Sequence, residues 1–163
     1  MTTTAPRTPA PSGQHPTASG ALPDGIPEDT VAWINEVGAD TLPGRMGITF
    51  LEASAERLVA TMPVAGNTQL YRMLHGGASV VLAESLGSIG AVLHAGDGHI
   101  AVGVDINATH HQAARGGTVT GVATALYLGR TTATYEVVVS DESGRRLCTS
   151  RITCTIHARR KRT

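Results

Sequence analysis

The sequence lacks most of the features that mark nucleic-acid-binding, membrane and secreted proteins. Its 163 residues carry 13 Lys and Arg against 13 Asp and Glu, so the net charge is zero, which argues against a general nucleic-acid or membrane-surface role. No apolar run approaches the roughly 20 residues that span a bilayer, and the polar N-terminus has no apolar stretch typical of a secretory signal. These absences predict a cytoplasmic protein of one domain.

Cysteines and the common metal and nucleotide motifs are equally scarce. Cys148 and Cys154 lie six residues apart in an expected strand, which separates them by about 20 Å, too far for a disulfide. No CxxC, HxH or HExxH pattern accompanies them or the seven histidines, so no metal site is expected. The sequence also lacks GxGxxG, GxxxxGK and GxSxG, the motifs of nucleotide binding and of one class of serine hydrolase.

The chain divides into a polar tail, one folded domain and a short basic end. Residues 1–27 are rich in Pro, Thr, Ser, Ala and Gly, a composition that buries too little apolar surface to offset its ordering entropy. We therefore expect a disordered tail there and a folded domain over residues 28–158. Residues 159–163, with the sequence RRKRT, are interpreted as a tail in solvent, with contact to ligand phosphates as the alternative.

The first part of the domain is expected to hold a short helix and two strands. Asp29 or Thr30 can cap the helix, and Pro43 and Gly44 are expected to end it. Between residues 46 and 64 apolar and polar residues alternate, which predicts a pair of strands. The helix face predicted to be apolar carries Val31, Ile34 and Val37.

A long apolar helix and four more strands follow. The segment MLHGGASVVLAESLGSIG, continued to Gly96, is too long and too rich in Ala and Leu for a strand. Strands are expected over 100–110, 117–128, 131–142 and 146–158, with turn signals between them. A helix that is apolar on nearly all sides needs a cover, and one long antiparallel sheet curled about it provides this. The predicted class is α+β with this layout, called the hotdog fold.

Glu84 is the one formal charge between Arg72 and Asp97. Burying an unpaired carboxylate costs several kcal/mol or makes it take up a proton. An exposed stripe of the helix and a functional carboxylate both explain this residue, although apolar neighbours occupy most angles of the helical wheel. Ser88 lies four residues on, on the same face, within hydrogen-bonding reach.

Gly76 and Gly77 stand where the helix must begin. Helix N-termini present unpaired N–H groups and a positive dipole end, and glycine lets a ligand oxygen approach that backbone closely. The pair could therefore bind an anion or an oxyanion. A plain loop-to-helix turn is the alternative, because two glycines alone are a weak signal.

Residues 28–157 resemble the hotdog acyl-CoA thioesterases that hydrolyse 4-hydroxybenzoyl-CoA, phenylacetyl-CoA derivatives and 1,4-dihydroxy-2-naphthoyl-CoA, especially the naphthoyl-CoA enzymes of menaquinone synthesis. The resemblance is carried by LHGGASVVLAES, by a glutamine six residues before the histidine, and by a glutamate nine residues after it. The segments ATMPV, INATH and RLCTSR add to it. Hotdog hydratases place their histidine and acid differently.

The resemblance implies catalytic roles for five residues and binding roles for five more. Glu84 would be the nucleophile or the general base, and the Gly76 N–H would polarise the thioester oxygen. Gln69 would position the acyl carbonyl or the water, His75 the substrate or the leaving thiolate, and Ser88 the water. The residues implied in substrate or CoA binding are Gly77, His110, Arg115, Gly129 and Arg130. No cofactor is implied, because CoA belongs to the substrate.

The sequence does not determine which acyl group the substrate carries. Gln112 stands where the menaquinone enzymes have an arginine, and Tyr71 and Arg72 replace less polar residues of the family. Menaquinone synthesis, phenylacetate breakdown and clearance of stray acyl-CoA esters are all compatible with the sequence. A hydratase of the same fold and a non-catalytic acyl-CoA-binding protein are the alternatives to a thioesterase.

The spacing of Gly76 and Glu84 bears on the number of chains. Eight residues of helix span about 12 Å, yet both groups would have to lie near 3 Å from one carbonyl group to share a reaction. Two antiparallel copies of the helix could bring Gly76 of one chain beside Glu84 of the other. We therefore expect a homodimer with shared sites, and the resemblance implies a homotetramer of two such dimers.

Overall fold

A computed structural model describes residues 27–159. The expectations for the two tails lie almost wholly outside this range. The helices are α1 (Thr30–Gly38), α2 (Leu42–Arg45) and α3 (Gly76–Ala95). The strands are β1 (Thr49–Ala53), β2 (Arg57–Pro63), β3 (His99–His110), β4 (Thr118–Leu128), β5 (Thr132–Ser140) and β6 (Arg146–Ala158).

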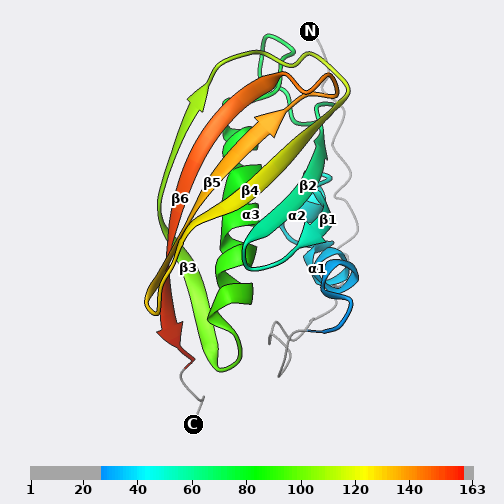
Figure 1. Ribbon diagram of the computed structural model, residues 1–163. Coiled ribbons are helices and arrows are strands. Elements are labelled where there is room, and N and C mark those ends of the chain that lie inside the picture. Colours follow the sequence, from blue (N-terminus) through cyan, green and yellow to red (C-terminus); the bar gives the residue numbers. More distant parts are fainter. Residues whose placement is uncertain (1–26, 160–163) are drawn as a thin grey trace, which may run out of the picture.

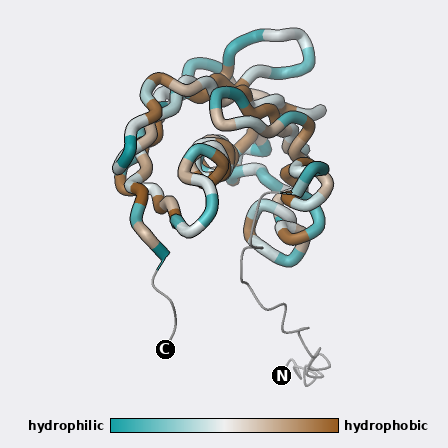
Figure 2. The backbone as a smooth tube through the Cα atoms, turned by 60° about the horizontal axis from the view of Figure 1, so that its bottom comes forward, coloured by the Kyte–Doolittle hydropathy of each residue, from teal (hydrophilic) through white to brown (hydrophobic). Residues whose placement is uncertain are grey.

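The six strands form one antiparallel sheet in the order β1-β2-β4-β5-β6-β3. The sheet curves round α3, which runs along its inner face (Figure 1). Figure 2 looks more nearly along α3 and shows the sheet arching round it, with the two short helices to one side. The α+β class and the hotdog layout predicted from the hydrophobic periods are therefore confirmed.

The face of α3 that meets the sheet is built from small and aliphatic residues. Gly87 and Gly90 let the strands come close: a methyl group on Gly87 would overlap Ile152 of β6, and one on Gly90 would lie 2.7 Å from Leu58 Cδ1 of β2. At these two glycines the backbone of the helix is therefore in close contact with side chains of the sheet. The fully buried residues of α3 are Ala78, Ser79, Leu82, Ala83, Leu86, Gly87, Gly90 and Ala91, spaced three and four apart.

The opposite face of α3 is only half-buried in this single chain. Val80, Val81 and Ile89 lie on it together with Glu84, so the helix is less enclosed than the sequence predicts. By length and hydropathy α3 could span a membrane, with 20 residues and a mean hydropathy of 1.5, which corrects the expectation that no apolar run approaches that length. Half of the window is buried inside the domain, as in the core helix of a globular protein.

The first helix ends earlier than predicted. Asp29 caps it by accepting a hydrogen bond from the Ala32 N–H at 2.9 Å, but α1 stops at Gly38. Pro43 and Gly44 lie inside the second short helix instead of ending the first. Proline is tolerated there because the N–H groups of a first helical turn have no intrahelical partner.

The apolar face predicted for α1 is only partly correct. Ile34 is buried and Val31 is half-buried, but Val37 is 55 % exposed. The helix is held on the sheet by Asn35, whose side-chain amide donates to the Phe50 carbonyl and accepts from the Phe50 N–H, both at 2.9 Å. This pair of bonds fixes α1 beside the first strand and leaves Val37 facing outward.

Strand β3 is a long open edge of the sheet. It pairs with β6 on one side only, and Ile100, Val102 and Val104 along it are 38–62 % exposed. A bulge between Gly103 and Asp105 interrupts its register with β6. Exposed apolar edge strands of this length tend to pair with another strand.

Replacing Gly87 should destabilise the domain. Gly87→Val is expected to lower the free energy of unfolding by about 2–3 kcal/mol, because the added methyl groups overlap Ile152 in a closely packed core. Urea denaturation measures the change. Gly116→Val is the matched control, because nothing lies within 4 Å of a Cβ there; equal stability of both variants would contradict the close helix–sheet packing.

Candidate active site

The start of α3 leaves one backbone donor free. His75 is the N-cap, and its Nδ1 accepts a hydrogen bond from the Gly77 N–H at 2.8 Å. The neutral imidazole that accepts at Nδ1 carries its proton on Nε2. Within residues 27–159 the Gly76 N–H has no acceptor. Of the two glycines, Gly77 is thus committed to the helix cap, and Gly76 retains an N–H that can bind an oxyanion.

Three of the predicted residues meet at this end of the helix. His110, the last residue of β3, lies over Gly76, with Nε2 2.9 Å from the position of a Cβ there. Gln69 Oε1 accepts from the Tyr71 N–H at 2.8 Å, so its amide NH₂ remains available as a donor. Gln69, Gly76 and His110 line one cavity of about 410 Å³, which we call the glycine cavity.

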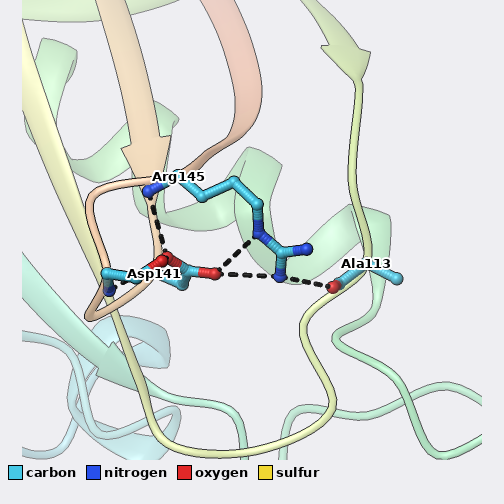
Figure 3. A network of polar contacts seen from close by, with 4 residues as sticks. Ala113, Asp141 and Arg145 are labelled. Atoms are coloured by element: carbon cyan, nitrogen blue, oxygen red, sulfur yellow. Dashed lines mark hydrogen bonds and ion pairs between the residues drawn. The ribbon is translucent and has the colours of Figure 1, made fainter.

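A charged clamp holds the segment that borders the glycine cavity. Arg145 donates to Asp141 from Nε at 3.0 Å, and its Nη2 donates to the carbonyl of Ala113 at 3.4 Å (Figure 3). Hydrogen bonds from Ser143 and from Arg145 lower the pKa of Asp141 from 3.8 to about 2. The clamp ties the β5–β6 turn to Ala113, which lines the glycine cavity.

Glu84 lies half-buried in the middle of α3. Ser88 Oγ donates to Glu84 Oε1 at 3.2 Å, as its position four residues on predicts. No cation of residues 27–159 forms an ion pair with Glu84. The carboxylate rests directly on Gly103 of β3, where any Cβ would overlap Glu84 Oε1. The carboxylate therefore lies next to the edge strand without a cationic partner in the described part of the chain.

Sequence reasoning missed Gly103. A glycine within a strand pattern suggests a bulge or a close approach of another group, and VGVDIN holds such a glycine. That signal does not say which group approaches. The structure shows that the bulge lies beside Gly103 and that the approaching group is the Glu84 carboxylate.

Glu84 and Ser88 open into a second cavity, of about 350 Å³, which we call the apolar cavity. Two hydroxyl groups of its lining already donate hydrogen bonds within the chain: Ser85 donates to the Val81 carbonyl, and Thr41 donates to the Gly38 carbonyl. Glu84 is the one charged group in the lining. The remaining lining residues are Trp33, Ile34, Val37, Gly38, Pro43, Phe50 and Ile89.

A single chain keeps the two halves of the predicted site apart. The glycine cavity and the apolar cavity share no lining residue. Gly76 and Glu84 lie on one helix, separated by about 12 Å of rise. The structure therefore brings Gly76 together with Gln69 and His110, and Glu84 with Ser88, but it does not bring the two groups together.

The predicted binding arginines also lie apart. Arg115 is exposed in the segment after β3, next to Ala114, whose carbonyl accepts from the Leu74 N–H at the start of α3. Gly129 and Arg130 form the β4–β5 turn, where His94, near the end of α3, bonds to the Gly129 carbonyl at 2.9 Å. The two arginines thus mark opposite ends of a 20-residue helix.

Over residues 27–159, no three His, Cys, Asp or Glu side chains gather closely enough to hold a metal ion. What the fold presents is a lone carboxylate in an apolar cavity and an unpaired N–H at a helix start. A carboxylate and an unpaired N–H on a hotdog fold are groups of the kind that acyl transfer to water uses.

Comparisons with known proteins place the chain more narrowly. The family model of the thioesterase superfamily matches residues 71–148. Proofreading thioesterase EntH of Cronobacter sakazakii is 43 % identical over 128 residues, which are 78 % of this chain and 93 % of that protein. The EntH of Klebsiella pneumoniae is 43 % identical over 126 residues, 77 % of this chain and 92 % of that protein.

Solved structures agree. Thioesterase HI1161 of Haemophilus influenzae has a TM-score of 0.77 at 32 % identity, over 83 % of this chain and 95 % of that chain. A mutant of thioesterase PA1618 of Pseudomonas aeruginosa has a TM-score of 0.77 at 35 % identity, over 84 % and 100 %. The chain belongs to the thioesterase superfamily and is a thioester hydrolase, which favours the thioesterase prediction over a hydratase or a non-catalytic binding protein.

Filling the space under Glu84 should impair hydrolysis. Gly103→Ala is expected to lower kcat/KM for an acyl-CoA by about 100-fold, because displacing a reacting group by about 1 Å has effects of that size. Thiol release measures it, with the melting temperature as a check on folding. Gly116→Ala is the control. A Gly103→Ala enzyme with the wild-type rate would contradict the assignment of Glu84 as the reacting carboxylate.

Proposed function

We propose that the protein hydrolyses an aromatic acyl-CoA thioester to the free acid and CoA, with Glu84 as the reacting carboxylate. The observation that carries this is Glu84 itself, which forms no ion pair within residues 27–159 and is the one charged group in the lining of its cavity. As a nucleophile it attacks the carbonyl carbon, the C–S bond breaks, and water cleaves the resulting anhydride. As a general base it takes a proton from the water that attacks. Both routes consume one water and release one acid and one CoA thiol.

The oxyanion formed in either route needs a donor. The Gly76 N–H is unpaired at a helix N-terminus, where the dipole favours negative charge. Gln69 offers its amide NH₂ beside it. His75 would donate from Nε2 to the leaving thiolate, and Ser88 would orient Glu84 or the water through its hydrogen bond. No cofactor enters these steps.

The shape and lining of the apolar cavity support an aromatic acyl group. Trp33 and Phe50 lie in its wall, and its hydroxyl groups from Thr41 and Ser85 are already engaged. Aromatic rings bury large areas and pair favourably with other rings. A benzoyl, phenylacetyl or naphthoyl group therefore suits the cavity, with its carbonyl next to Glu84.

A second chain would supply the missing donor through strand β3. Its exposed apolar edge has one row of unpaired backbone groups, which antiparallel pairing with a second β3 would satisfy. Ile106, Ala108 and His110 lie opposite buried residues of β6, so they face inward. Two strands related by a twofold axis must match inward with inward residues.

Centring that axis on Asn107 meets the requirement. Ile106 then lies opposite the partner's Ala108. Because Val104 is bulged out of the register, Gly103 falls opposite the partner's His110. The Glu84 carboxylate rests on Gly103, and the His110 ring lies over Gly76. Because Gly103 lies opposite the partner's His110, this pairing brings Glu84 next to the partner's Gly76. The apolar cavity of one chain and the glycine cavity of the other thus form one site.

The CoA portion fits the same arrangement. Arg130 lies by the end of α3. That end is 11 residues beyond Glu84 along the helix, or roughly 16 Å. This distance leaves room for the pantetheine arm between the thioester and the phosphates. Arg115 of the partner lies at the start of the other helix, near Gly76. Arginine suits phosphate because its planar fork donates two parallel hydrogen bonds.

The outer face of the sheet supports a homotetramer of two such dimers. Glu136 and Arg151 lie opposite each other on β5 and β6, and most of the outward side chains of the central strands carry no charge. A surface of this kind suits packing against a second sheet. The half-buried outward residues include Thr118, Thr120, Val122, Thr134, Val138, Thr149 and Thr153.

We place this enzyme in the cytoplasm, where acyl-CoA esters are used.

Oxidative cross-linking tests the pairing of β3. Asn107→Cys is expected to give a disulfide-linked dimer in high yield, because Cβ atoms directly opposite in antiparallel strands lie about 4.5–5.5 Å apart. Non-reducing electrophoresis measures the product. Thr109→Cys is the control, since it would face Asp105 of the partner. Native cysteines do not interfere, as both are buried. Cross-linking of the control alone would contradict the register.

Thiol release from a panel of acyl-CoA esters tests the activity. Wild type is expected to prefer benzoyl-, phenylacetyl- or naphthoyl-CoA to acetyl-CoA, because an acetyl group is too small to contact most of the apolar cavity's walls. Glu84→Gln keeps the size of the side chain and should lower kcat by about 1000-fold or more. A wild-type rate in Glu84→Gln, or equal rates with all esters, would contradict the proposal.

A further inference from the structure

The tip of the loop before α3 exposes two large apolar side chains. Leu70 is 97 % exposed and Tyr71 is 78 % exposed. They project from a hairpin-like turn that begins and ends with the bridge between Thr68 and Leu74. No contact within residues 27–159 accounts for this pair of residues, which are the most exposed large apolar side chains of the domain.

The tip is nevertheless fixed in shape. Gln69 donates its N–H to the Met73 carbonyl at 2.8 Å, and its own carbonyl accepts from the Arg72 N–H at 2.9 Å. Its side-chain Oε1 accepts from the Tyr71 N–H. Arg72 adopts φ +60°, a left-handed conformation that non-glycine residues rarely take. These three hydrogen bonds fix the backbone that carries Leu70 and Tyr71 before anything covers the two side chains.

Apolar side chains that protrude from a fixed backbone turn are typical of anchors that enter a pocket. Because the backbone is already ordered, little further entropy is lost when they bind. The occupant that they meet must offer an apolar surface. In this chain the mouth of the apolar cavity offers one: Val37 lines it and is 55 % exposed, and Leu42 beside it is 57 % exposed.

The pairing of β3 brings these two surfaces together. Gln69, at the base of the tip, lines the glycine cavity with Gly76 and His110. In the dimer that cavity abuts Glu84 of the other chain, which lines the apolar cavity. In the proposed dimer the tip of one chain therefore lies next to the partner's apolar cavity, whereas the glycine and apolar cavities of one chain share no lining residue.

We infer that Leu70 and Tyr71 of each chain close the partner's apolar cavity and set the length of acyl group that it accepts. This inference rests on the proposed function, because it deepens the account of the same site. The tip then has two tasks. Gln69 positions the reacting carbonyl, and Tyr71 forms the wall at the far end of the acyl group, with the phenol edge facing the aromatic residues of the cavity.

The first test compares two esters that differ only in length. The ratio of kcat/KM for 4-phenylbutanoyl-CoA to that for benzoyl-CoA is measured for wild type and for Tyr71→Ala. Removing the Tyr71 side chain should raise this ratio by about tenfold or more, since each methylene that an apolar pocket accommodates changes kcat/KM by a factor of that size. Tyr71→Phe is the control and should keep the wild-type ratio. An unchanged ratio in Tyr71→Ala overturns the inference.

The second test asks which chain supplies the wall. Hybrid dimers are purified through two different tags, so that each contains one active carboxylate. In the first, a Tyr71→Ala chain is paired with a Glu84→Gln chain, and its active Glu84 faces a wild-type tip; the wild-type ratio is expected. In the second, a chain with both substitutions is paired with a wild-type chain, and the raised ratio is expected.

The reverse assignment of ratios to the two hybrids would show that the tip closes the cavity of its own chain and would overturn the inference. Equal ratios in both hybrids would overturn it as well. Failure of the underlying function is distinguishable, because it would appear as hydrolysis that persists in the Glu84→Gln homodimer. The substituted tip residue, Tyr71, is exposed, so folding is expected to be unaffected, and circular dichroism verifies this.

Discussion

The rise of an α-helix, 1.5 Å per residue, governs how this protein can work. Gly76 begins α3 and Glu84 lies eight residues along it, so the donor and the carboxylate of one chain cannot reach the same carbonyl group. The two cavities that they line are accordingly separate. The proposed mechanism therefore requires a second helix running the other way, and the open edge of β3 is the surface through which we propose that a second chain pairs.

Close packing around α3 makes the rest of the arrangement possible. Gly87 and Gly90 let the sheet approach the helix from within, and Gly103 lets Glu84 rest on the edge strand. The carboxylate thereby lies beside the strand that would carry the partner, while Ser88 holds one of its oxygens. Small residues on both elements thus place the Glu84 carboxylate at the edge of the sheet where we propose that the second chain pairs.

Much of this was predictable from local patterns, and the remainder depends on contacts between distant segments. Alternating apolar residues predict strands, and segment length with Ala and Leu content predicts α3. The isolated charge of Glu84 and the glycines at 76 and 77 predict the candidate site. The sequence does not reveal that Pro43 lies in the first turn of a second helix, because proline is acceptable in a first turn as well as beyond a helix end. Nor does it connect Gly103 with Glu84, or Trp33 with the same cavity, because strand register and helix docking decide these contacts.

Complementation between two inactive variants tests the shared site most directly. Gln69→Ala and Glu84→Gln homodimers are assayed for thiol release, and then a hybrid of the two chains is purified through different tags. The account predicts two nearly inactive homodimers and a hybrid with about half of the wild-type rate, because one of its sites combines an intact Glu84 with an intact Gln69 across the interface. A hybrid as inactive as its parents would show that each site lies within a single chain and would contradict the account.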